Sequence, residues 1–426
     1  MLKSPKDLLR EELVCFQTKM DLKDGTLGIG ISIRKSPRTG LIQHVNPTID
    51  LINMRSFTKL KVRKSLDGAR FSHWLPLYFG ETEEFEVSEE HYDEGLDEMV
   101  SKKRLVNTLR RFETHVEKSV RFLVTGSTRK ELSPEHILEF MPKLINTHVL
   151  DLMKENRHIS ILAIRRLFNF IRLFAYFMNK DPRIQEQMEG RVKRFIDDPE
   201  QRTKKNTPNL GDLQVFSTMS RQFSHADMIK AYVDEQLDRN VMWMLIKIPE
   251  LDFENKKLNK RNASKTTESE RIKICFESSK TGLYFTAFFV HLNACVEKFT
   301  GQKPKNFAEL ARVLDQNHGC LPTEAENHFQ QALFSISKIE DFKSYFNLIG
   351  YEVNSEKETY DKLIAAVKNS RQKGYHGRDD RSAIRQKEVE VVADMSESRL
   401  LKLVTQFCDA KIEREEFKPD DAESVA

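Results

Sequence analysis

The chain has 426 residues, of which 39% are hydrophobic and 31% charged, enough apolar material for one large core or two modest ones. Its 69 Lys and Arg residues nearly balance 65 Asp and Glu residues, and a net charge of +4 is too small to indicate a general nucleic-acid-binding protein. The amino-terminal residues lack the apolar run of a secretory signal, and arginines interrupt the apolar stretch 159–178, so we expect neither export nor a membrane span.

The first eighty residues predict a small α/β unit. After a short amphipathic helix, Leu8–Thr18, the segment 27–34 alternates apolar with small or polar residues, as strands do. Turn residues and a second apolar run, 41–45, complete a β-hairpin that we expect Asn46-Pro47 to end. Trp74–Phe79 is a candidate third strand.

The rest of the chain predicts a multi-helix domain, so the expected fold class is mainly α. An acidic stretch, 81–99, is typical of a solvated connector, and helical apolar spacing begins at about Leu105. Ser133-Pro134 and the pair Ser224 and Asp227 are typical of helix starts. The predicted helices span residues 137–153, 159–178, 184–196, 224–245, 272–299, 307–314, 323–336, 360–370 and 396–407.

We divide this predicted domain at a lysine-rich polar linker, residues 251–270. The first half then covers residues 100–250 and the second half residues 271–410. The last residues, 411–426, predict a disordered acidic tail.

The sequence contains no recognisable catalytic or cofactor motif. Gly28-Ile-Gly30 resembles the start of a dinucleotide-binding fingerprint, but Ile33 occupies the third glycine position and no helix follows. We therefore interpret both glycines as strand residues and predict no cofactor. Neither a GxSxG elbow nor a phosphate-binding loop is present, which favours a non-enzymatic role.

One group of residues has the chemistry to bind zinc. His291 and Cys295 are four residues apart and share a face of a predicted helix, while His318 and Cys320 lie in a later loop. The aromatic neighbours of His291 favour an ordinary core helix, so we predict no metal site. The five cysteines include no CxxC pair, which favours reduced thiols in the cytoplasm or nucleus.

Two sets of basic residues could bind an anionic partner. The first set is Arg165 and Arg172 on one predicted helix, with Arg157 just before it. The second set is Lys368, Arg371 and His376 in a later segment. The seven-residue spacing of Arg165 and Arg172 places them on one side of their helix. The competing interpretation is a solvated helix face, or arginines paired with acids of a neighbouring helix.

Several stretches together resemble a region of large, poorly characterised eukaryotic proteins. They are Pro47–Ile52, Lys61–Ser65, His73–Tyr78, Met141–Thr147, Asp238–Val241 and Lys368–Gly377. In those proteins the region often lies beside a ubiquitin-conjugating-type domain. His44-Val-Asn46-Pro47 differs in order from the His-Pro-Asn element of conjugating enzymes, and no cysteine follows closely, so that domain is not predicted here. The resemblance implies no catalytic residue, only association with the ubiquitin system.

The sequence therefore favours a non-catalytic protein-interaction or scaffold module with protein partners. The resemblance suggests that this module is associated with the ubiquitin system. The alternative is an RNA- or phosphate-binding helical protein that uses local basic patches. Either role leaves the oligomeric state open.

Overall fold

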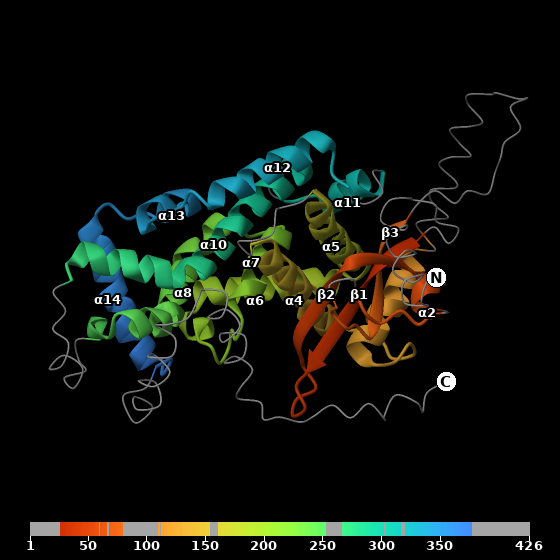
Figure 1. The fold of residues 1–426 in the computed structure, drawn as a ribbon, viewed down its shortest axis with the longest axis horizontal. Helices are drawn as coiled ribbons and strands as arrows, with labels where there is room; N and C mark the ends of the chain where they lie inside the picture. The colour runs from red at the N-terminus through yellow and green to blue at the C-terminus, as the bar shows by residue number, and fades with distance from the viewer. Residues whose placement is uncertain are drawn as a thin grey trace, which may run out of the picture.

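The fold combines a small antiparallel sheet with a long array of helices, and was obtained as a computed structural model. The structure describes residues 26–58, 60–65, 68–79, 110, 112–153, 161–252, 266–301, 304–316 and 320–376. The sheet and α14 (Glu356–Gln372) lie at opposite ends of the molecule (Figure 1). The mainly α fold class is confirmed. The predicted helices 8–18 and 396–407, the acidic connector and the acidic tail lie outside the described residues.

The sheet has the order β2-β1-β3, with antiparallel neighbours. Its strands are β1 (Thr26–Lys35), β2 (Ile42–Asn53) and β3 (His73–Phe79). The predicted hairpin and third strand are confirmed. The prediction that Asn46-Pro47 ends the second strand is wrong, because β2 continues to Asn53. β2 is an edge strand, and a proline without an N–H is tolerated at a sheet edge.

The two glycines of β1 make room for aromatic rings on one face of the sheet. A Cβ atom at Gly28 would lie 2.6 Å from Trp74 Nε1, and one at Gly30 would lie 2.2 Å from the Phe71 ring. Trp74 and Phe71 form a second, small core with Ile52 and Val62, and Met54, Phe57 and Leu60 pack against it. Gly28 and Gly30 are therefore strand residues, as predicted, and allow the close approach that a side chain would prevent.

Apart from α2, which lies between β2 and β3, the helices follow the sheet in the chain. They are α2 (Met54–Thr58), α4 (Pro134–Leu152), α5 (Ile161–Lys180), α6 (Pro182–Asp197), α7 (Leu210–Met219), α8 (His225–Lys247), α10 (Glu268–Thr300), α11 (Phe307–Gln316), α12 (Thr323–Ile336), α13 (Phe342–Ile349) and α14, with short 3-10 helices η1 (Pro199–Arg202) and η2 (Pro249–Leu251). Residues 112–125 are also helical, and Gly126, with φ +71°, directly follows them. Every helix that we predicted within the described residues is present.

The predicted helix starts are confirmed by their capping contacts. Ser133 is the N-cap of α4, and its N–H donates to His136 Nδ1 at 3.1 Å. Ser224 is the N-cap of α8, and its N–H donates to Asp227 Oδ2 at 2.6 Å. Such reciprocal contacts satisfy the first N–H groups of a helix, which have no intrahelical acceptor.

Three helices, α2, α7 and α13, were not predicted. Every residue from Leu213 to Met219 in α7 is buried, so this helix lacks the polar face that produces a recognisable helical period. α13 has only eight residues and depends on its caps: Asp341 accepts the Ser344 N–H at 2.7 Å, and Gly350 ends the helix with φ +70°.

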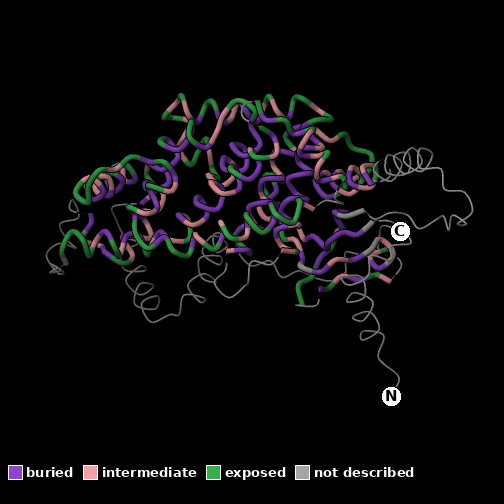
Figure 2. Tube along the Cα trace, turned by 90° about the horizontal axis from the view of Figure 1, so that it is seen from above, coloured by how far each residue is buried: buried purple, intermediate pink, exposed green. Residues whose placement is uncertain are grey.

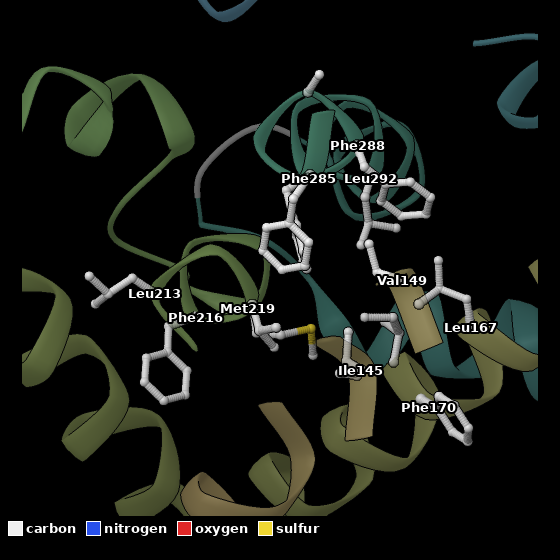
Figure 3. Packing of buried hydrophobic residues seen from close by; sticks show 14 of the residues in the cluster. Ile145, Val149, Leu167, Phe170, Leu213, Phe216, Met219, Phe285, Phe288 and Leu292 are labelled. Atoms are coloured by element: carbon white, nitrogen blue, oxygen red, sulfur yellow. The ribbon is translucent and has the colours of Figure 1, made fainter. Parts of the chain in front are cut away.

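One contiguous core runs from the sheet into both predicted halves of the helical region. Ile29 and Ile31 of β1 belong to the same cluster of buried residues as the centres of α5 and α10. α10, from the second half, packs against α4, α7 and α8 of the first. Buried residues line the inside of the helical array and exposed residues its outer turns (Figure 2). Side chains from α4, α5, α7 and α10, including Val149, Leu167 and Met219, lie between these helices (Figure 3).

Candidate functional site

A group of charged side chains meets where the end of α14 lies against α8. We call Glu235, Asp238, Arg239, Lys373 and Tyr375 the α8–α14 cluster. Lys373 Nζ donates to Glu235 Oε2 at 2.6 Å and to Asp238 Oδ2 at 2.7 Å. The Tyr375 hydroxyl donates to Glu235 Oε1 at 2.7 Å, and Arg239 Nε donates to the same oxygen at 2.6 Å. The cluster therefore joins segments that lie far apart in the sequence.

The acids of this cluster are more deeply buried than its lysine. The side chains of Glu235 and Asp238 are 0% and 4% exposed, whereas that of Lys373 is 27% exposed. Burial raises the pKa of Asp238 to about 6, although the hydrogen bond from Lys373 opposes this shift. Removing one partner from such a group would leave a buried charge without compensation. The cluster is thus an electrostatic cross-link between α8 and the end of α14.

Arg239 and Tyr375 extend the cluster to the segment after α6. Arg239 Nη2 donates to the carbonyl oxygens of Arg202 and Thr207, both at 2.7 Å. The Lys204 N–H donates to the Tyr375 hydroxyl oxygen at 2.9 Å, and Lys204 Nζ lies 4.4 Å from the centre of the Tyr375 ring. Two of the stretches that carry the family resemblance, around Asp238 and after Lys368, are therefore in contact.

A second set of contacts fixes the same end of α14. Arg371 forms an ion pair with Asp252, and His376 Nε2 lies 4.0 Å from Asp252 Oδ2. His376 Nδ1 is also 2.9 Å from the Ser370 hydroxyl oxygen. Two of the predicted anion-binding residues, Arg371 and His376, thus face a carboxylate of their own chain. The third, Lys368, is exposed on α14.

The predicted anion-binding arginines of α5 lie toward the sheet, far from α14 (Figure 1). Arg165 donates two hydrogen bonds to the carboxylate of Glu326 on α12, at 2.9 and 3.0 Å. Arg172 is buried, donates to a carbonyl oxygen of β3, and lies 3.9 Å from Asp315 of α11. Arg157 lies outside the described residues. The structure does not bring the two predicted basic sets together.

Of the four residues that we considered for zinc, His291 and Cys295 lie on α10, and Cys320 lies before α12. His291 Nε2 is 3.3 Å from the Ser335 hydroxyl oxygen near the end of α12, whereas Cys320 precedes the start of that helix. Cys295 is buried, which raises the pKa of its thiol to about 12. His318 lies outside the described residues. Within the residues that the structure describes, no group of three or more His, Cys, Asp or Glu side chains could hold a metal ion.

Sequence reasoning missed other groups with shifted pKa values. Asp212, at the start of α7, accepts hydrogen bonds from Asn209 at 2.7 Å and Asn146 at 3.2 Å, and burial raises its pKa to about 7. His148 Nε2 lies 2.9 Å from the Ala163 carbonyl oxygen, and burial lowers its pKa to about 4. Part of each environment comes from another helix, Asn146 of α4 for Asp212 and Ala163 of α5 for His148, so no local motif could have identified them.

Comparisons with known proteins do not assign a family. No protein-family model matches this chain, and a search of curated proteins found no match either. No helix among the described residues is long and apolar enough to cross a membrane. The resemblance that the sequence carries therefore stays a prediction.

Proposed function

We propose that this protein is a non-catalytic interaction or scaffold module with protein partners. The main support for this proposal is that the charged side chains of the α8–α14 cluster pair with one another. Its buried carboxylates, Glu235 and Asp238, bind Lys373 of the same chain, whereas a catalytic acid or base must reach a proton of the substrate. Acidic and basic side chains that pair within one chain stabilise its fold. We therefore expect this protein to act through its surface.

The link to the ubiquitin system, and a location in the cytoplasm or nucleus, belong to the same proposal. The first rests on the resemblance of six sequence stretches, three of which lie in or beside the sheet. The second is supported by free, buried thiols at Cys275 and Cys295.

The alternative, an RNA- or phosphate-binding protein, has less support. Arg165 and Arg371 each face a carboxylate of the chain itself, and the two basic sets lie far apart. A single anion site built from both sets is therefore not part of our proposal.

Cross-linking of the tagged full chain in cell extract, followed by mass spectrometry, tests the proposed function. We expect reproducible protein partners, with components of the ubiquitin system among them, that an unrelated helical bait of similar charge does not capture. The proposal fails if no partner is reproducible while the purified chain turns over a substrate. Partners without any component of the ubiquitin system would remove that link alone.

A further inference from the structure

The sheet region carries a charge imbalance that the net charge of the whole chain conceals. Residues 26–79 contain nine Lys or Arg residues but only two Asp or Glu residues, although the complete chain has a net charge of +4. A region with such an excess of positive charge creates a local potential that attracts negatively charged partners. The position of these cations decides whether that potential reaches the solvent.

Several of the cations lie on a tight hairpin that follows α2. We call the described residues 60–65 and 68–71 the basic hairpin. Lys64 and Arg70 pair across it as an antiparallel bridge, and both are exposed, as is Lys61. The Phe71 N–H donates to the Arg63 carbonyl oxygen at 3.0 Å, which closes the hairpin. The bridge places two exposed cations side by side, with a third three residues earlier.

The second core holds this hairpin against the sheet. Val62 and Phe71 are buried, and the Phe71 ring lies over Gly30 of β1, where no side chain would fit. Lys61 has φ +54°, a conformation that is unfavourable for a residue with a side chain. The second core thus fixes the position of the hairpin, and Lys61 adopts a left-handed backbone conformation within it.

Arg63 has a different role from its neighbours. Its Nη1 donates to the carbonyl oxygens of Phe57 at 2.7 Å and Val62 at 2.8 Å, and its guanidinium lies 3.6 Å from the centre of the Phe57 ring. Arg63 therefore holds α2 against the hairpin. The pKa of nearby His73 is lowered first by burial and then by the charges of Lys35 and Arg63.

The chemistry of the basic hairpin favours carboxylates over nucleic acid. Its one aromatic residue, Phe71, is buried, so it offers no ring on which a base could stack. Binding to a phosphate backbone depends on the number of phosphates that Lys and Arg neutralise, and the described residues of the hairpin offer three exposed cations. A compact group of ammonium and guanidinium charges matches a short run of Asp and Glu side chains instead.

We propose that the basic hairpin, through Lys61, Lys64 and Arg70, is the docking surface for an acidic segment of a protein partner. This inference rests on the proposed function, because it names the chemistry of the partner. The exposed cations supply the attraction, and the second core fixes their positions before binding.

Titration of the full chain with a fluorescent octaglutamate peptide, followed by anisotropy, tests the inference. We expect saturable binding that weakens as salt rises, and at least a tenfold weaker affinity for the variant Lys61→Glu/Lys64→Glu/Arg70→Glu. The matched control replaces three exposed lysines elsewhere on the molecule. It is Lys338→Glu/Lys343→Glu/Lys357→Glu, and it should bind octaglutamate within about twofold of the natural chain.

Two further titrations separate competition within the chain and RNA binding from the proposed docking. Residues 81–98 contain ten Asp or Glu residues and could compete with the peptide, so the titration is repeated with those acids changed to Asn or Gln. Absence of binding in both chains overturns the inference, as does equal weakening by the two triple variants. Tighter binding of octauridylate than of octaglutamate at equal salt would assign the surface to RNA and also overturn it. If partners captured from extract remain bound to the hairpin variant, this inference fails while the proposed function stands.

Discussion

The α8–α14 cluster and the basic hairpin both gather positive charge, but they use it in opposite ways. In the cluster, Lys373 lies between two buried carboxylates and links α8 to α14. In the hairpin, Lys61, Lys64 and Arg70 are exposed on a platform that the sheet supports. Charge that is matched inside a fold stabilises that fold, whereas charge that faces water remains available to a partner. The comparison predicts that substitutions in the two regions will affect different properties.

The largest effect should come from Lys373→Met. The change leaves Asp238 buried without its cation and Glu235 with Arg239 alone, and we expect the free energy of unfolding to fall by about 2 kcal/mol. This magnitude allows for the partial exposure of Lys373. Urea unfolding monitored by circular dichroism measures it. Lys368→Met, at an exposed position of the same helix, should change stability by less than about 0.5 kcal/mol, and equal effects of the two variants would contradict the cross-link.

A comparable loss of stability is expected for Gly30→Ala, which disturbs the packing that holds the hairpin against the sheet. The new methyl group would overlap the Phe71 ring, so we expect destabilisation by about 1–3 kcal/mol and faster amide exchange in residues 60–71. Gly190→Ala in α6 is a control of opposite sign. The nearest atom to its added Cβ is 3.6 Å away, and replacing glycine within a helix should stabilise the protein by about 0.5–1 kcal/mol. If Gly30→Ala changed neither the stability nor the amide exchange of the hairpin, Phe71 would not fix the hairpin.

A pH-dependent effect of intermediate size should distinguish the buried acids from the exposed cations. The folded-state pKa of Asp212 is raised to about 7, so its contribution to stability is complete below about pH 3.8 and is lost as pH rises through 7. The stability of the natural chain relative to Asp212→Asn should therefore fall by about 2 kcal/mol between pH 4 and pH 7.5, allowing for partial exposure.

Chemical denaturation of both proteins at each pH gives this difference. His148 titrates in the opposite sense, because its lowered pKa removes stability as pH falls from 6.5 toward 4. That contribution is common to both proteins and cancels. A difference that is constant from pH 4 to pH 7.5 would contradict the burial of the Asp212 carboxylate.

The smallest effect on stability is expected for the hairpin variant Lys61→Glu/Lys64→Glu/Arg70→Glu. Its three side chains are exposed, so thermal and urea unfolding should differ from the natural chain by less than about 0.5 kcal/mol. Relief of repulsion among the cations could even offset the change. Destabilisation as large as that of Lys373→Met would mean that these cations serve the fold, and the comparison between the two regions would fail.

Local sequence patterns predicted most of the secondary structure. Capping residues such as Ser133 and Ser224 marked helix starts because they act on N–H groups within the next turn. α7 was not predicted, because a helix that is buried on all sides has no amphipathic pattern. The continuation of β2 past Pro47 depended on its edge position, which only the assembled sheet defines.

The candidate sites were far less predictable than the elements that carry them. Lys373 meets Glu235 across 138 residues, and Arg165 meets Glu326 across 161, so no spacing rule relates these partners. The basic hairpin has local sequence signals, the stretch Lys61–Ser65 and the glycines of β1. Their connection, a Phe71 ring seated on Gly30, becomes visible only in three dimensions.

Hydrogen–deuterium exchange of the full chain, with and without saturating octaglutamate, tests the central contrast most directly. We predict slower exchange in residues 60–71 on peptide addition, with residues 368–376 unchanged, because the first region offers exposed charge and the second has matched it internally. Protection of residues 368–376 instead, with the basic hairpin unaffected, would contradict this account.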